Sequence, residues 1–267
     1  QILTTVYFYL TLVGCHLFVG FFLIPWFFFI DNREMLRRGL YICHTILRFI
    51  QKPILNIEFH NVPKNPKDFV FFVNHVTAWD CFWVDELNNE NMTVIVAQFV
   101  VEIPLFGAWV RKMGGIPIKF AKPNDQQSTE TNKESARLSA QESSAWLEKP
   151  NFTMGLFPEG LRTKTGKVGE FKPLIFRLAI RNKKVVYPCV LLGARKIHPL
   201  GQTWISPGNM VIKYGDAIPT DTMTECNEDI QGLMKKVQYF VWSDFMVPIF
   251  GLFDSFTEPR RTTAQSL

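Results

Sequence analysis

Charged side chains are missing from the start of the chain: no Lys, Arg, Asp or Glu occurs from Gln1 to Ile30. A helix of roughly 20 apolar residues is long enough to cross a bilayer. No small-residue cleavage site follows the apolar stretch, which argues against a removable secretory signal. We therefore expect residues 1–52 to form N-terminal helices that associate with a membrane. Pro25 can kink or end a helix, so a shallow segment is an alternative to a span.

Several other patterns are absent, and each absence excludes a class of protein. There is no Cys-x-x-Cys pair, no zinc-finger spacing and no Lys/Arg run alternating with exposed aromatics, so nucleic acid is not an expected partner. The five cysteines are odd in number and widely spaced, which is typical of reduced thiols in a cytosolic environment. No Gly-x-Ser-x-Gly elbow occurs, which argues against a serine hydrolase.

What the chain has in abundance is phenylalanine and a mild positive charge. Many of its 25 Phe residues lie in 8–29 and 240–256, a local enrichment that indicates membrane contact. The net charge of +5 suits an anionic membrane surface or a phosphorylated substrate, and equally an ordinary protein surface. Arginines at 33, 37 and 38 follow the apolar stretch, so the positive-inside tendency places the rest of the chain on the cytoplasmic side.

Strand and helix patterns alternate after residue 52, which favours an α/β fold. The expected strands are 54–59, 69–73, 92–97, 116–118, 153–157, 185–192, where Pro188 interrupts the pattern, and 210–214. The expected helices are the basic amphipathic 33–50, then 80–88, 105–113, 131–148 with a capping box of Thr131 and Glu134, 174–181 and 227–242. We predict a mixed, largely parallel central sheet flanked by helices, forming one domain over 53–267 with an apolar C-terminal tail.

A histidine and an aspartate lie close together after the apolar run 69–73. His75 can take a proton from a hydroxyl, and Asp80 can hold the other ring nitrogen if the residues between them turn into a helix. Asp85 and Glu86 are alternative partners that would reach His75 less easily. The competing interpretation is a loop histidine beside an aspartate helix cap. No second histidine lies near His75, so we expect no metal site.

A second polar segment follows the expected strand 153–157. Gly160 permits a tight turn, Arg162 offers a planar fork for a phosphate, and Glu159 can orient that arginine or bind a substrate hydroxyl. A plain surface turn is the alternative for Pro-Glu-Gly. A base together with an anion site is what acyl transfer to a phosphorylated alcohol requires.

These segments resemble the sequence blocks of the glycerolipid (lysophospholipid or 1-acylglycerol-3-phosphate) acyltransferase family. The matching positions are Asn74, His75, Thr77 and Asp80 in the first block, 113–118 in the second, Phe157, Pro158, Glu159, Gly160, Arg162 and Thr163 in the third, and 186–190 in the fourth. The resemblance covers about residues 55–220. One departure is that Lys119 and Phe120 stand where the second block usually ends in an acidic residue and an arginine. That arginine helps to hold the substrate phosphate in the family, and Lys119 or Lys122 can substitute for it.

The resemblance implies a membrane-bound enzyme with His75 and Asp80 as its catalytic pair. His75 would deprotonate the free hydroxyl of a lysophospholipid, which attacks the thioester of acyl-CoA or acyl carrier protein as co-substrate, with no other cofactor. The residues implied to bind substrate are Asn74, Thr77, Glu159, Gly160, Arg162, Thr163 and Lys119.

The favoured acceptor is 1-acylglycerol-3-phosphate, which would give phosphatidic acid. Two alternatives stay open, another lysolipid acceptor and a non-catalytic lipid-binding membrane protein.

Overall fold

The computed structural model describes most of the chain. The described residues are 1–29, 33–64, 68–77, 79–80, 92–104, 106–112, 114–121, 131–163, 165, 167–199 and 201–250. The expected helix 80–88, apart from Asp80, and the end of the expected apolar tail beyond residue 250 lie outside them.

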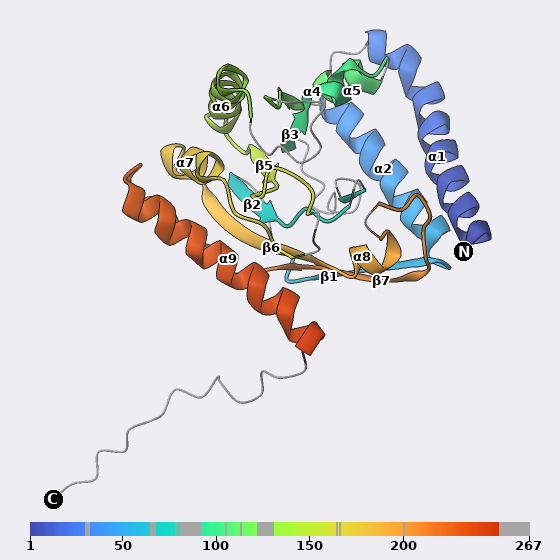
Figure 1. Ribbon diagram of the computed structural model, residues 1–267. Coiled ribbons are helices and arrows are strands. Elements are labelled where there is room, and N and C mark those ends of the chain that lie inside the picture. Colours follow the sequence, from blue (N-terminus) through green and yellow to red (C-terminus); the bar gives the residue numbers. More distant parts are fainter. Residues whose placement is uncertain are drawn as a thin grey trace, which may run out of the picture.

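A seven-stranded sheet forms the centre of the molecule, with the strand order β1-β7-β6-β2-β5-β3-β4 (Figure 1). The strands are β1 (Leu55–His60), β2 (Phe69–Val73), β3 (Met92–Ala97), β4 (Ile116–Ile118), β5 (Thr153–Leu156), β6 (Val185–Leu192) and β7 (Gly208–Tyr214). Every neighbouring pair is parallel except β6 and β7, which run antiparallel. The expected mixed, largely parallel α/β sheet is confirmed.

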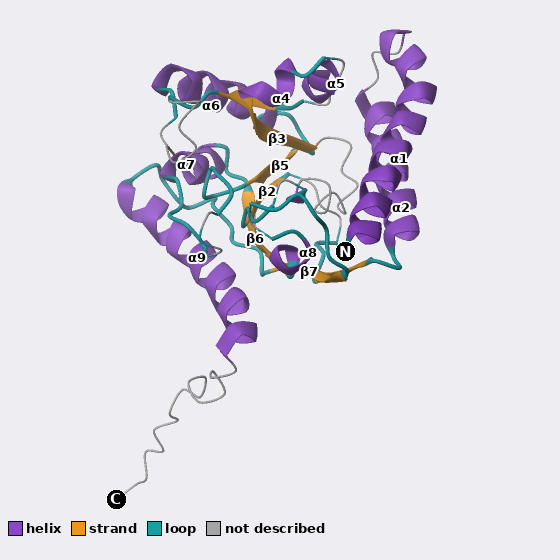
Figure 2. Ribbon diagram, turned by 45° about the vertical axis from the view of Figure 1, so that its right-hand side comes forward, coloured by secondary structure: helices purple, strands orange, loops and turns teal. Residues whose placement is uncertain are grey.

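Helices cover both faces of this sheet (Figures 1 and 2). They are α1 (Ile2–Phe29), α2 (Arg33–Gln51), α4 (Gln98–Glu102), α5 (Phe106–Lys112), α6 (Lys133–Leu147), α7 (Pro173–Arg181), α8 (Ala194–Ile197) and α9 (Asn227–Phe250). Helices α1, α2 and α8 lie on one face, whereas α6, α7 and α9 lie on the other (Figure 1).

The central strand β2 shows why the core has two halves. All five of its residues are buried, and side chains alternate between the faces of a strand. Phe69, Phe71 and Val73 pack in the cluster that contains side chains of α1, α2 and α8. Val70 and Phe72 pack in the cluster that contains side chains of α6, α7 and α9. A strand buried on both sides needs a continuous apolar run, which is what the sequence provides.

The two N-terminal helices pack against each other and against the sheet. The Gln51 side chain donates to the backbone oxygen of Phe8 at 3.2 Å, and the Sγ atoms of Cys15 and Cys43 lie 3.2 Å apart. Pro25 does not end α1, which continues to Phe29. Within the described part of the chain, no helix is both long enough and apolar enough to cross a membrane. The expected membrane span is therefore not confirmed, and the boundary at residue 52 stays a prediction.

Two local expectations are corrected by the structure, and two short helices were not predicted. Pro188 does not interrupt β6, because its carbonyl accepts from Gly215 N just beyond the last β6–β7 pair, where its missing N–H costs no ladder bond. Asn132, not Thr131, caps α6 by accepting from the backbone N–H of Ser135. The short helices α4 and α8 were not expected, because each is too short to show a helical period.

Candidate active site

Three neighbouring parallel strands end at one edge of the sheet. They are β6, β2 and β5, and the segments that follow β2 and β5 carry the first and third sequence blocks. In parallel sheets, functional side chains gather outside the carboxyl ends of the strands. The topology therefore brings together two segments that lie about 80 residues apart in sequence.

His75 and Asp80 form a hydrogen-bonded pair at this edge. Their Nδ1 and Oδ2 atoms lie 2.8 Å apart. Because a carboxylate can only accept, this contact assigns the ring proton to Nδ1 and leaves the lone pair on Nε2. The described residues between the two do not form the helix that we expected. Instead, the Asp80 side chain closes a tight turn.

The Asp80 carboxylate is fully buried, with 0% of its side chain exposed, and accepts from several groups of that turn. Besides His75, the backbone N–H of Val76 donates to Oδ2 at 2.6 Å and that of Thr77 at 2.9 Å. The Thr77 hydroxyl donates to Oδ1 at 2.7 Å. Four donors around one carboxylate fix its position and so fix the orientation of the imidazole.

The imidazole of His75 is also held from its face. It stacks on the Phe157 ring, with the centroids 4.0 Å apart and the planes at 19°. Its side chain remains 21% exposed. Since Nδ1 is bound to Asp80, the Nε2 edge is the part available to an incoming hydroxyl. The arrangement suits general base catalysis.

Glu159 makes contacts that the sequence did not predict. Its Oε1 accepts from the backbone N–H of His75 at 3.1 Å, and its Oε2 from that of Gly169 at 2.7 Å. Only 6% of the residue is exposed. Burial raises the pKa of Glu159 above its usual range, although both hydrogen bonds act in the opposite direction. Both carboxylate oxygens therefore join parts of the chain, and neither contacts Arg162.

The turn after β5 has the form that Pro-Glu-Gly predicts. Gly160 has a positive φ of 73°, a conformation that residues with a Cβ rarely adopt, and its N–H donates to Phe157 O at 3.0 Å. Arg162 follows with an exposed side chain. The backbone N–H of Thr163 donates to His75 O at 2.8 Å, which holds the third block directly against the first.

Asn74 and Thr77 are both buried and bonded within the protein. Asn74 donates to Leu191 O at 3.1 Å and accepts from Leu191 N at 2.7 Å, which joins the ends of β2 and β6. Thr77 is engaged by Asp80, and its Oγ1 also accepts from Trp79 N at 3.1 Å. Through these hydrogen bonds, Asn74 and Thr77 hold the segment that carries His75 and Asp80 in place.

Lys119 is the one expected site residue that lies apart from the others. It follows β4, the edge strand, which is three positions from β2 in the sheet. At about 4.8 Å per strand, that places its backbone on the order of 14 Å from β2. Lys119 lies at the same edge of the sheet, and among the described residues it forms no hydrogen bond or ion pair with His75 or Arg162.

Sequence reasoning missed Phe157 as the stacking partner of His75, and also Gly169 and Leu191. Phe157 lies in the third block, so its residue type was a usable signal. Gly169 and Leu191 act through backbone atoms, which leave no signature in the choice of side chain.

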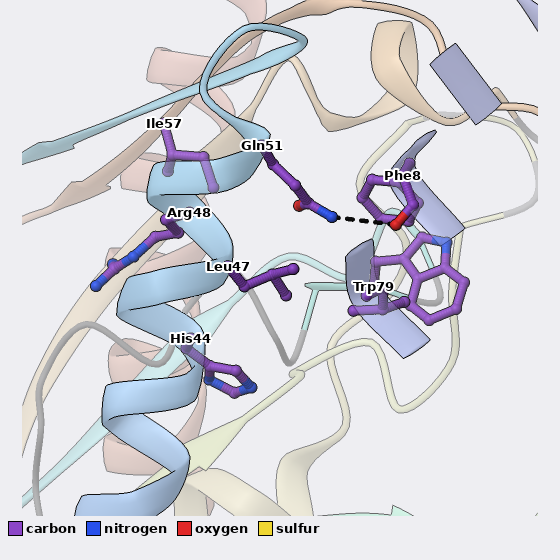
Figure 3. A pocket seen from close by; sticks show the side chains of 8 residues that line it. Phe8, His44, Leu47, Arg48, Gln51, Ile57 and Trp79 are labelled. Carbon is purple, nitrogen blue, oxygen red and sulfur yellow. Dashed lines mark hydrogen bonds between the residues drawn. The ribbon is translucent and has the colours of Figure 1, made fainter. Parts of the chain in front are cut away.

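The aromatic ring of Trp79 connects this loop to the N-terminal helices. Its centroid lies 5.8 Å from that of Phe8 and 5.7 Å from that of Tyr9, both in edge-on geometry. A cavity of about 10 Å³ lies beside it, lined by side chains of α1, α2 and β1 (Figure 3). That volume holds about one water molecule, so this cavity is not a site for an acyl chain.

A sequence profile of the acyltransferase family matches residues 56–192, about half of the chain. The chain belongs to the acyltransferase family. The matched range begins in β1 and ends in β6, so it includes the His75–Asp80 pair and the turn at Glu159. The expected membership of an acyltransferase family is thereby confirmed.

Relatives within this acyltransferase family carry a common description. A chloroplastic 1-acyl-sn-glycerol-3-phosphate acyltransferase of Arabidopsis thaliana is 29% identical over 177 residues, 65% of this chain and 46% of its own length. A 1-acyl-sn-glycerol-3-phosphate acyltransferase of Cocos nucifera is 26% identical over 156 residues, 58% of this chain and 47% of its own length. The chain thus spans about half the length of these curated relatives.

One solved structure shares the fold of this acyltransferase family member. It is the crystal structure of the 1-acyl-sn-glycerophosphate acyltransferase PlsC from Thermotoga maritima, with a TM-score of 0.70. The match covers 91% of this chain and 94% of that chain at 21% sequence identity. At that identity the likeness establishes a common fold.

Proposed function

We propose that this chain is a 1-acylglycerol-3-phosphate O-acyltransferase, which moves an acyl chain from a thioester donor to the free hydroxyl of a lysophosphatidate and forms phosphatidic acid. The observation that carries the proposal is the His75–Asp80 pair, whose Nε2 edge is open beside the Arg162 turn. The descriptions of the relatives from Arabidopsis thaliana and Cocos nucifera support the choice of acceptor.

The reaction needs a base, and His75 is placed to be one. Its Nε2 takes the proton of the acceptor hydroxyl as that oxygen attacks the thioester carbonyl carbon. The imidazolium that forms lies beside the Asp80 carboxylate, which stabilises it. When the tetrahedral intermediate collapses, the carbon–sulfur bond breaks and the proton passes from Nε2 to the departing thiolate. The products are a diacyl lipid and the free thiol of CoA or acyl carrier protein.

The other site residues of the sequence blocks have different roles. Asn74, Thr77 and Glu159 are positioning residues, since their polar atoms bond to other parts of the chain. Gly160 and Arg162 face outward, and Arg162 offers its guanidinium to the acceptor phosphate. Lys119 follows β4, two strands from β5 in the sheet, and suits a more distant part of either substrate.

The outer surface of the N-terminal helices supports a proposal of membrane attachment. Leu3, Leu10 and Leu17 recur every seven residues on α1 and are between 67% and 86% exposed. Ile46 and Phe49 are exposed on α2. Such apolar faces suit the acyl boundary of a bilayer, where lipid substrates reside. We propose that α1 and α2 bind a lipid surface with the sheet on its cytoplasmic side, at a depth that the sequence left open between a span and a shallow attachment.

The decisive experiment measures the product. Membranes containing the protein are incubated with labelled acyl-CoA and 1-acylglycerol-3-phosphate, beside the same amount of the His75→Ala variant. We expect labelled phosphatidic acid from the wild-type protein alone. Free fatty acid without diacyl lipid would identify a hydrolase. No product across a panel of lysolipids, with acyl carrier protein also tried as donor, would favour the non-catalytic lipid-binding alternative.

A further inference from the structure

A short segment just before β7 is fastened to the first helix. This segment, residues 203–206, is called the Trp204 segment below. The Tyr9 hydroxyl donates to Thr203 O at 3.0 Å, and Oγ1 of Thr5 accepts from Ile205 N at 2.9 Å. Figures 1 and 2 both show the start of α1 beside α8 and β7. The segment therefore runs alongside the first turns of α1, in the opposite direction.

Trp204 is held at the surface by this arrangement. Ile205 is fully buried and packs in the core cluster that contains Phe8, whereas Trp204 is 40% exposed. Because Thr203 and Ile205, on either side of it, are both bonded to α1, the backbone between them is fixed. Tryptophan is highly buried on average in proteins, so an indole fixed in an exposed position points to a contact outside the chain.

The exposed indole borders the apolar outer face of α1. Leu3 and Leu10 are exposed on that face. On the other flank of α1, the Tyr7 hydroxyl donates to Ile50 O of α2 at 2.5 Å, and the Ile50 side chain is itself exposed. Residue 7 lies two residues from both 5 and 9, about 200° around the helix, so α2 and the Trp204 segment flank α1 on opposite sides. The three segments form one apolar surface with α1 in its middle.

The charges that border this surface are all positive. Residues 1–30 carry no charged side chain, and residues 35–57 and 194–215 contain Lys and Arg but no Asp or Glu. Lys52, Arg195 and Lys196 are exposed. An apolar surface with a cationic border matches the acyl and headgroup layers of an anionic bilayer. A second copy of the chain, paired through the same surface, would instead bring like charges together.

We propose that the indole of Trp204 inserts into the headgroup layer of an anionic bilayer, as a third membrane contact beside α1 and α2. This inference rests on the lipid attachment proposed above. Tryptophan suits that layer because its ring is apolar and its N–H is a hydrogen-bond donor. Contacts on both flanks of α1 prevent the helix from rolling about its axis on the lipid surface.

The orientation of α1 matters for the active site because one side chain joins the two. The Tyr9 ring lies 5.7 Å from that of Trp79, the residue next to Asp80, while the Tyr9 hydroxyl bonds to Thr203. The Trp204 segment and the catalytic loop are therefore held by the same tyrosine. A bilayer contact at Trp204 fixes the height of His75 above the lipid from which the acceptor comes.

The first test measures binding of the full chain to vesicles of phosphatidylcholine mixed with phosphatidylglycerol, by sedimentation. It compares wild type with Trp204→Ala and Trp242→Ala. Trp242 is the matched control, since it is 53% exposed on α9, which covers the other face of the sheet. We expect Trp204→Ala to weaken vesicle binding by about 5- to 20-fold, the effect of withdrawing part of a large aromatic ring from an apolar environment. Trp242→Ala should bind as wild type does, and equal binding by Trp204→Ala would overturn the proposal.

A second measurement locates the ring and uses a milder change. Lipids brominated on the acyl chain near the headgroup quench the fluorescence of tryptophans that enter the bilayer. We expect Trp204→Phe to lose quenched fluorescence relative to wild type, and Trp242→Phe to lose only fluorescence that the bromines do not quench. The same quenched intensity in Trp204→Phe and wild type would reject insertion of Trp204.

The remaining outcomes separate this contact from the reaction. Neither measurement needs turnover, so a protein that forms no phosphatidic acid still supports the contact if Trp204→Ala binds vesicles more weakly. Wild type that fails to bind vesicles would overturn both the lipid attachment and the Trp204 contact. A wild-type dimer that Trp204→Ala converts to a monomer, with vesicle binding unchanged, would show that a second copy covers this surface and that the proposal is wrong.

Discussion

The two ends of the strand pair β2 and β6 treat positive charge in opposite ways. At the amino ends, Lys184 is 8% exposed and its Nζ lies 2.6 Å from Oδ1 of Asp68, so its charge is balanced within the chain. At the carboxyl ends, Asn74 joins the same two strands through uncharged hydrogen bonds. There, Arg162 is exposed, and the carboxylates of Asp80 and Glu159 are already engaged by donors of the chain. One end of the pair is complete by itself, whereas we propose that the other binds an anionic substrate.

The difference shows how one sheet can serve stability and chemistry at once. Burying a cation is costly unless it is paired, so Lys184 comes with Asp68. Leaving cations unpaired at an exposed edge costs little and keeps them available to a substrate. Changes at the carboxyl edge should therefore reduce activity, and changes at the amino edge should reduce stability.

The largest expected effect is the loss of the base. His75→Ala should lower kcat by a factor of about 10² to 10⁴, the usual contribution of general base catalysis. The thermal unfolding midpoint should change little, since the imidazole is partly exposed. Initial rates of labelled phosphatidic acid formation and a thermal melt measure the two. A fall of less than tenfold would mean that another group takes the proton.

The second largest effect is expected for Asp80→Asn, which should lower both activity and stability. Asp80→Asn keeps the size of the side chain, but its amide nitrogen faces donors of the turn or the His75 ring. We expect kcat to fall by at least about tenfold and the free energy of unfolding by about 1–3 kcal/mol, the cost of buried donors left without an acceptor. Urea unfolding and rates on the same preparation test this. The exposed Asp216→Asn is the matched control, and equal stability of the two variants would contradict the four hydrogen bonds to the buried Asp80 carboxylate.

A smaller effect is expected at Glu159. Because its oxygens bond to His75 N and Gly169 N, Glu159→Gln should lower kcat by about tenfold and leave KM for lysophosphatidate unchanged. Glu170→Gln, an exposed change in the same loop, is the control. A raised KM with normal kcat would instead make Glu159 a ligand of the acceptor.

The smallest effect is expected at the amino ends of β2 and β6, where Lys184 pairs with Asp68. Burial alone would raise the pKa of Asp68, but its hydrogen bonds and the charge of Lys184 outweigh burial and lower that pKa. A lowered folded-state pKa contributes stability above the unfolded value of about 3.9, and this contribution is lost as pH falls through the folded value. Asp68 is 44% exposed, so Lys184→Met should cost no more than about 1 kcal/mol at pH 7. Urea unfolding from pH 7 to pH 3 should show the difference from wild type shrinking in acid, with activity at pH 7 within twofold. A difference that grows in acid would contradict the assigned pairing.

Most of the sheet could be predicted from long apolar runs, whereas contacts made through single backbone groups could not be predicted. Residues 69–73 and 185–192 could be assigned because strands buried on both faces leave no polar positions. The antiparallel pairing of β7 with β6 has no such signal. In the site, residue type and position after a strand predicted the meeting of His75 with Asp80. The partners of Glu159 are backbone N–H groups, which any residue supplies, so its bridging contacts could not be predicted.

The edge-on contacts of Trp79 with Phe8 and Tyr9 bear on how the protein can be shortened. The residue next to Asp80 rests on the first helix, so that helix forms part of the wall behind the catalytic loop as well as an outer surface. Deleting residues 1–52 to obtain a smaller catalytic unit would remove the Phe8 and Tyr9 rings that pack against Trp79. A more soluble protein obtained in this way would have a less firmly packed His75–Asp80 loop. Polar replacements confined to the exposed side of α1 would keep the contacts of Trp79 with Phe8 and Tyr9.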